Sequence, residues 1–191
     1  YLRKLQLNDF EPAVNLATLT KLQDAHLKYI PYENFDCLNG KITSLKRQDM
    51  FNKVIMHNRG GICFELNGLY NWLLESLGFD VTSYSARFID KMETYQLRRH
   101  RVMCVALGDK RYLTDVGVNS ESPRVPLEIT EGLIQSDGIS QYKFTRSEFW
   151  GWLLWQKERG KIWKRLFGFT EEPQIDKDFI TASFWCDAHP D

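Results

Sequence analysis

Apolar residues recur at helical spacing in the first part of the chain. One stripe predicts a helix that Pro31 ends, and it consists of Leu19, Leu22, His26 and Tyr29. A second helix is expected from about Lys46 to His57, with Thr43 or Ser44 available as its N-cap. Its buried side would be formed by Met50, Phe51, Val54 and Ile55.

The clearest helical pattern begins at Cys63, directly after the glycine pair Gly60-Gly61. Gly78 supplies its stop, and its apolar stripe consists of Leu66, Leu69, Tyr70, Leu73, Leu74 and Leu77. The N-terminus of a helix favours a negative charge, and a thiol is a nucleophile only as the thiolate. Cys63 is therefore a candidate nucleophile, with a buried structural cysteine as the alternative.

After Gly78 the pattern changes to short runs of β-branched and aromatic residues, which predict strands at 81–89, 102–107 and 112–116. Gly108-Asp109 would turn the last two into a hairpin. A loop at Pro123 and Pro126 precedes further short strands. The runs 152–155 and 162–169 flank Gly160, which favours a second hairpin over a helix.

Composition and charge limit the classes of binding partner that we expect for this chain. The chain has 191 residues, and its 25 basic and 25 acidic residues give a formal charge of zero. We therefore expect no nucleic-acid partner, and the lack of a long apolar run predicts no membrane partner. The four cysteines are widely spaced, which favours free thiols in a reducing cytoplasm over disulfides or a metal site.

The first hairpin offers a base and an acid for Cys63. A two-residue turn would place Leu107 opposite Lys110 and His100 opposite Gly117, so that Asp115 lies on the face of His100 at a diagonal position. A simple surface contact is the alternative. The other histidines are weaker candidates: His26 on a helix face, His57 at a helix end and His189 in the terminal segment.

The run from Arg59 to Gly68, RGGICFELNG, closely resembles the cysteine motif of arylamine N-acetyltransferases. Further segments resemble the same family in the same order: residues 30–36, 78–81, 85–87, 100–103 and 112–117. The resemblance covers most of residues 1–130. Two features depart from the family: Val118-Asn119 stands where an aromatic residue and a glycine are usual, and family members are longer.

The resemblance implies an α+β fold with a papain-like cysteine-enzyme core. A helical domain at 1–83 would carry the cysteine, and an antiparallel β-barrel domain at 84–191 would carry the histidine and the aspartate. A third, α/β domain would be largely absent from this chain. The catalytic triad carried over from the family is Cys63, His100 and Asp115. Glu33 and Arg59 would pair to support the cysteine loop, and Tyr32 and Val118 would lie at the acceptor site.

The implied activity is acetyl transfer from acetyl-CoA to a small arylamine or hydrazine, with a role in xenobiotic metabolism. The acetyl group would pass through a thioester on Cys63 in a two-step, ping-pong reaction, with acetyl-CoA as the acyl donor and no metal. Two alternatives stay open. The same residues serve amide chemistry in cysteine peptidases and transglutaminases, and the chain could also be a truncated, inactive acyl-CoA-binding module.

Overall fold

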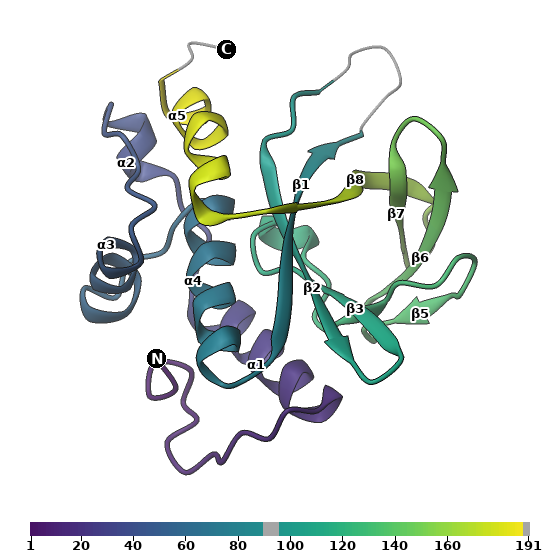
Figure 1. The fold of residues 1–191 in the computed structure, drawn as a ribbon, viewed down its shortest axis with the longest axis horizontal. Coiled ribbons are helices and arrows are strands. Elements are labelled where there is room, and N and C mark those ends of the chain that lie inside the picture. Colours follow the sequence, from purple (N-terminus) through teal and green to yellow (C-terminus); the bar gives the residue numbers. More distant parts are fainter. Residues whose placement is uncertain (90–95, 189–191) are drawn as a thin grey trace.

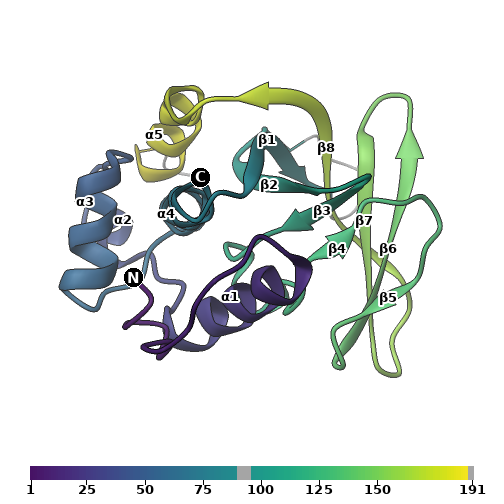
Figure 2. The same ribbon diagram turned by 60° about the horizontal axis from the view of Figure 1, so that its bottom comes forward.

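The protein combines helices with one antiparallel sheet of eight strands (Figure 1). The computed structural model describes residues 1–89 and 96–188. Helices from the N-terminal part lie on one side of the molecule, and the sheet curls away from them (Figure 2). The expected α+β class, with a helical part followed by an antiparallel barrel-like sheet, is confirmed.

The first predicted helix is α1, Leu16–Tyr29. Asn15 caps it by accepting the Thr18 N–H at 2.8 Å, and Pro31 follows its end. Leu19, Leu22 and His26 are buried, as the stripe predicted. A short helix, α2, Phe35–Leu38, follows.

The second predicted helix is α3, Arg47–Phe51, continued by a π-helical turn, η1, Asn52–Met56. The predicted span is confirmed, but the predicted N-cap is wrong, because Lys46 takes that position without a side-chain cap. Ser44 Oγ instead donates to Asp49 at 2.6 Å, and Thr43 Oγ1 donates to Asp187 at 2.9 Å. Both hydroxyls therefore bind carboxylates, and the local sequence pattern does not indicate either partner.

Helix α4, Cys63–Ser76, runs through the middle of the molecule. It begins at the predicted cysteine, and Gly78 follows its end with φ +86°. Leu66, Leu69, Tyr70 and Leu74 are almost fully buried in the core that α4 shares with α1 and β2. The helix therefore holds Cys63 against both the helical part and the sheet.

The first half of the sheet consists of β1, Asp80–Phe88; β2, His100–Leu107; β3, Lys110–Thr114; and β4, Leu127–Glu128. The predicted β2–β3 hairpin and its Leu107–Lys110 pair are confirmed. The predicted His100–Gly117 pair is wrong: the ladder ends at Met103–Thr114, and His100 pairs with Ala86 of β1. Beyond Thr114 the chain leaves β2. The next backbone N–H groups, those of Val116 and Gly117, donate to the side chains of Asn67 and Asp115 instead of to β2.

The second half consists of β5, Gln135–Ser136; β6, Ser140–Ser147; β7, Gly151–Glu158; and β8, Lys164–Gln174. The predicted second hairpin, β7–β8, is confirmed. The strand order is β4-β3-β2-β1-β8-β7-β6-β5. The two edge strands approach each other, because Gln135 accepts the Glu128 N–H at 2.7 Å and donates to the Glu128 carbonyl at 2.9 Å. One side-chain amide thus bridges the open edge of the barrel.

Two short 3₁₀ turns, η2, Asn119–Glu121, and η3, Asp176–Phe179, precede β4 and helix α5, Ile180–Ala188. The pattern along the chain did not predict α5, which returns to the start of α4 (Figure 1). There Phe179 and Cys186 pack in a cluster with Ile62, Cys63 and Phe64. The division at 83/84 falls inside β1 and stays a prediction. His189 lies outside the described residues.

Candidate active site

Cys63 is the first residue of α4 and is 8% exposed. The two glycines before it allow close packing. A Cβ atom on Gly60 would lie 2.1 Å from the Pro31 carbonyl oxygen, and one on Gly61 would lie 2.8 Å from Glu65. The chain at Tyr32 pairs with Gly61 as a β-bridge. The glycine pair is therefore required where the segment after α1 crosses the start of α4.

His100 and Asp115 form a buried pair, with His100 Nε2 and Asp115 Oδ2 2.7 Å apart. Both side chains are 0% exposed. The other ring nitrogen, His100 Nδ1, is buried and has no hydrogen-bond partner among the described residues. A ring that donates from Nε2 to this carboxylate has Nδ1 as its remaining nitrogen, with a free lone pair. This is the arrangement of a general base.

The structure brings Cys63 next to this pair without a direct hydrogen bond to His100. The Cys63 thiol faces the carbonyl of Arg99, the residue before His100, at 3.8 Å. On the other side lies Gly117, where a Cβ atom would be 2.8 Å from Cys63 Cα. The start of α4, the start of β2 and the chain that follows β3 thus meet at Cys63.

Asn67, one turn along α4 from Cys63, fixes Asp115. Its Nδ2 donates to Asp115 Oδ1 at 2.8 Å and to the Arg101 carbonyl at 2.5 Å, and its Oδ1 accepts the Val116 N–H at 2.9 Å. Asp115 Oδ1 also accepts the Gly117 N–H at 2.8 Å. The pattern along the sequence did not single out Asn67. Its position four residues after the cysteine was the available signal.

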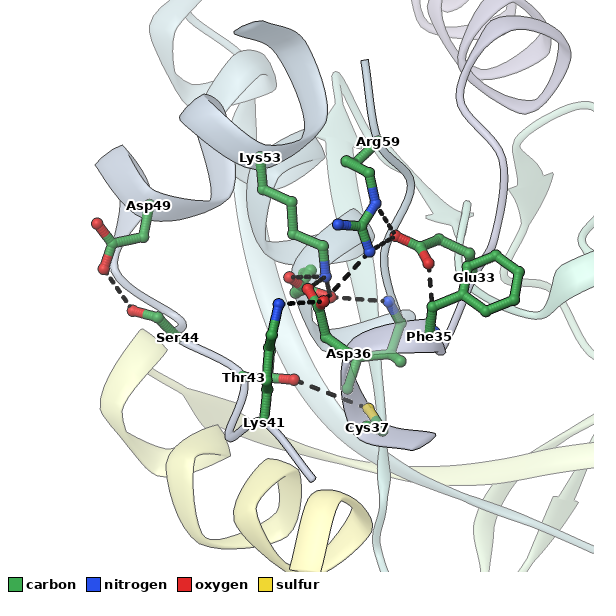
Figure 3. A network of polar contacts seen from close by, with 12 residues as sticks. Glu33, Phe35, Asp36, Cys37, Lys41, Thr43, Ser44, Asp49, Lys53 and Arg59 are labelled. Carbon is green, nitrogen blue, oxygen red and sulfur yellow. Dashed lines mark hydrogen bonds and ion pairs between the residues drawn. The ribbon is translucent and has the colours of Figure 1, made fainter. Parts of the chain in front are cut away.

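An ion-pair network, which we call the loop network, supports the chain around Cys63 (Figure 3). Arg59 binds Glu33 at 2.8 Å and Asp36 at 3.3 Å. Lys53 binds Asp36 at 3.0 Å and Glu65 at 2.9 Å. Glu65 in turn accepts the N–H of Ile62, the residue before Cys63. The sequence pointed to the Glu33–Arg59 pair but missed Asp36, Lys53 and Glu65.

Electrostatics at the site favour a neutral thiol unless a cation is near. Burial raises the pKa of Cys63, and the nearby Cys186 and Asp115 raise it further, while hydrogen bonds from the backbone of Phe64 and Arg101 lower it. In the loop network, the hydrogen bond from Lys53 is the largest influence that lowers the pKa of Asp36, to about 2. Burial raises the pKa of Glu65 in spite of Lys53.

The two residues expected at the acceptor site lie in different surroundings. Tyr32 is 37% exposed, and burial followed by the nearby Cys63 thiol raises the pKa of its phenol. Val118 is 6% exposed and packs with Leu113 and Leu127 in the core of the barrel. Tyr32 is thus close to Cys63, whereas Val118 faces the barrel core. Their roles stay predictions.

Neither a metal site nor a membrane span is evident in the described part of the chain. No group of three or more His, Cys, Asp or Glu side chains among residues 1–89 and 96–188 could hold a metal ion. Within the same ranges, the helices are too short or too polar to cross a bilayer.

The fold and the site resemble those of known proteins. Residues 15–191 match the N-acetyltransferase family. The arylamine N-acetyltransferase of Mycolicibacterium smegmatis is 35% identical over 196 residues, covering 100% of this chain and 70% of that protein. A solved M. smegmatis arylamine N-acetyltransferase has a TM-score of 0.94 and 34% identity, covering 100% of this chain and 70% of the other.

A further solved structure contains a ligand. It is the Mycobacterium marinum arylamine N-acetyltransferase in complex with CoA, with a TM-score of 0.91 and 26% identity, and it covers 100% of this chain and 71% of the other. The sheet, the helices and the matched residues define the protein as an N-acetyltransferase by fold. The chain belongs to the arylamine N-acetyltransferase family, which confirms the resemblance of its motifs. It spans 61–72% of the length of the curated relatives that it matches.

Proposed function

We propose that the protein transfers an acetyl group from acetyl-CoA to the nitrogen of a small arylamine or hydrazine, through an acetyl-thioester on Cys63. The observation that carries the proposal is the buried 2.7 Å contact between His100 and Asp115 beside the cysteine. Family membership and the M. marinum relative solved with CoA support acetyl-CoA as the donor.

In the first step, His100 Nδ1 takes the proton of the Cys63 thiol, and the imidazolium stabilises the thiolate that burial disfavours. The thiolate attacks the thioester carbon, the bond between that carbon and the CoA sulfur breaks, and CoA leaves with the proton from His100. Backbone N–H groups in the first turn of α4 are suited to stabilise the oxyanion. The two titrations are coupled, so a measured pKa belongs to the Cys63–His100 pair.

In the second step, the acceptor amine attacks the acetyl-thioester. His100 takes a proton from the nitrogen, and Asp115 holds the ring in the tautomer that leaves Nδ1 free. Cys63 departs as the thiolate, which closes the cycle. Tyr32 and Val118 are proposed to contact the acceptor, and the Glu33–Arg59 pair is proposed to support the loop. A reducing, cytoplasmic location and a role in xenobiotic metabolism belong to the same proposal.

The test is mass spectrometry of the intact chain after incubation with acetyl-CoA. We expect one acetyl adduct, located on Cys63, which a subsequently added arylamine removes. Cys63→Ala should carry no adduct and should not turn over, whereas Cys104→Ala, which removes a buried thiol of the barrel core, should keep both properties. Asp115→Asn should fold and lose most activity, because the ring loses its orienting acceptor.

The two alternatives give different results in the same experiment. Peptide cleavage or glutamine deamidation without an acetyl adduct would indicate peptidase or transglutaminase chemistry. Acetyl-CoA that raises the melting temperature without acetylating Cys63 would indicate an inactive binding module. Turnover by Cys63→Ala at the wild-type rate would refute the proposed nucleophile.

A further inference from the structure

The outer side of strands β6, β7 and β8 carries a row of basic and aromatic side chains. Lys143 of β6 pairs with Trp155 of β7, and Trp155 pairs with Arg165 of β8. Because side chains alternate across a strand, these three project away from the barrel core, which Phe144, Leu154 and Leu166 fill. Lys157 and Trp163 continue the same face, which we call the basic face: Lys143, Trp155, Lys157, Trp163 and Arg165.

Positive charge on this face is not balanced by acids. Residues 157–165 contain five basic side chains and one acid, Glu158. Glu158 binds Lys161 at 2.6 Å and Lys164 at 3.5 Å, and Lys164 also pairs with Glu121 from outside this segment. Within the described ranges no ion pair is formed by the remaining basic residues, Lys143, Lys157, Arg159 and Arg165. The zero net charge of the chain therefore hides a local excess of positive charge.

Two exposed isoleucines lie at one end of the basic face. Ser140 pairs with Glu158, so the β5–β6 turn and the β7–β8 turn are neighbours. The first turn presents Ile139, 61% exposed, and the second presents Ile162, 86% exposed. In Figure 2 these strands form the wall of the sheet farthest from α3 and α4, so the surface is separate from the Cys63 site. The exposed apolar tips therefore lie beside basic side chains, such as Arg159, that form no ion pair within the described ranges.

We propose that the basic face and its two isoleucine tips dock on a membrane surface that contains anionic phospholipids, which departs from the expectation of no membrane partner because surface docking needs no spanning helix. Lys and Arg side chains bind lipid phosphates, while exposed aliphatic side chains such as Ile139 and Ile162 suit the boundary between headgroups and acyl chains. A single-stranded nucleic acid fits less well, because stacking needs open aromatic faces. Here the Trp155 and Trp163 rings each have two cations within 6.0 Å of their centroids.

The experiment is flotation of the whole chain with vesicles of pure phosphatidylcholine and with vesicles that also contain phosphatidylserine. We expect binding to the anionic vesicles alone, and weaker binding as the salt concentration rises. Replacing Lys157→Gln together with Arg165→Gln, both on the basic face, should weaken binding roughly fivefold per charge removed. Ile162→Gln, which removes the apolar tip without changing the charge, should weaken it as well, and this separates apolar insertion from charge alone.

The matched control is Lys28→Gln together with Lys46→Gln, which removes two exposed charges from the helical part. It should bind anionic vesicles like the wild type. Three results would overturn the proposal: no flotation with anionic vesicles at low salt, equal weakening by the control pair, or loss of oligonucleotide binding rather than vesicle binding in the basic-face variant. Acetylation of Cys63 should be unchanged in all these variants, because the basic face lies outside the active site.

Discussion

At the scale of single residues, Gly117 decides how closely the chain after Asp115 approaches Cys63. A Cβ atom there would lie 2.8 Å from Cys63 Cα and 2.8 Å from Asn67 Nδ2. We expect Gly117→Ala to displace Cys63 from His100 and to slow acetylation about 100-fold, the size of effect that small misplacements have. Mass spectrometry over time would measure the rate.

Gly108→Ala is the control for this prediction. No atom lies within 4 Å of a Cβ at Gly108, although its φ of +63° makes alanine cost about 1–2 kcal/mol of stability. It should be less stable but acetylated at the wild-type rate. Equal acetylation rates in the two variants would show that the contact between Gly117 and Cys63 has no role.

His26 makes the stability of the protein depend on pH. The ring is buried against Tyr70, with Nδ1 2.8 Å from the Tyr1 hydroxyl, and burial lowers its pKa to about 3. Below pH about 6.5 the unfolded chain takes up a proton that the folded chain excludes, so stability falls as pH drops from 6.5 towards 3. The contribution is at most about 1.4 kcal/mol per pH unit.

Urea unfolding of His26→Gln at several pH values would check this dependence. The slope of stability against pH should be smaller than in the wild type between pH about 6.5 and 3, whereas His57→Gln, at an exposed position, should keep the wild-type slope. An unchanged slope in His26→Gln would contradict the assignment.

These residues also show what the sequence could predict about the site. Cys63 was visible because a glycine pair and a strong helical stripe frame it. The hairpin turn placed Asp115 near His100, although the His100–Gly117 pair that it assumed is wrong. Asn67, Lys53 and Asp36 were not visible, since each acts through contacts between elements far apart in the chain. A periodic pattern reports which side of an element is buried, and it contains no information on polar partners across the fold.

At the scale of elements, the π-helical turn η1 and helix α4 are joined through Lys53 and Glu65. The Lys53 side chain is 17% exposed and that of Glu65 is 3% exposed. Removing one partner of a buried pair leaves the other charge without compensation, so we expect Lys53→Met to cost about 3 kcal/mol of unfolding free energy. Urea denaturation would measure it.

The double variant Lys53→Met with Glu65→Gln should lose less stability than Lys53→Met, because the neutral amide can still accept the Ile62 N–H. Lys41→Met, which removes a 68% exposed partner of Asp36, should change stability by less than about 0.5 kcal/mol. A double variant that is as unstable as the single one would argue against an uncompensated charge as the cause.

At the scale of the whole molecule, the barrel is bridged at its open edge by one side chain, that of Gln135. Gln135→Leu keeps the volume but leaves the backbone N–H and carbonyl of Glu128 without their partner. We expect a loss of about 2 kcal/mol in unfolding free energy. Gln141→Leu, at an exposed site on β6, should change it by less than about 0.5 kcal/mol. Equal effects would show that the bridge adds no stability.

The order of strands was beyond prediction from local patterns, although both hairpins were found. The sheet consists of two meanders, β1 to β4 and β5 to β8, in which neighbours along the chain pair with each other. Turn residues such as Gly108 indicate that the strands on either side of the turn pair with each other. Nothing in the pattern reports that β1 pairs with β8, because that contact joins Ser83 to Gln174.

The pairing of β1 with β8 also has a consequence for the order of folding. Within each meander the connections are much shorter than the stretch of chain that joining β1 to β8 closes, so their closure costs less entropy. We expect that step to be slow. Cys63, Asn67, His100 and Asp115 all precede β4, but the His100 ring contacts Phe167 of β8 and Cys63 packs with Cys186 of α5. The packing around these residues is therefore completed only after the two meanders meet.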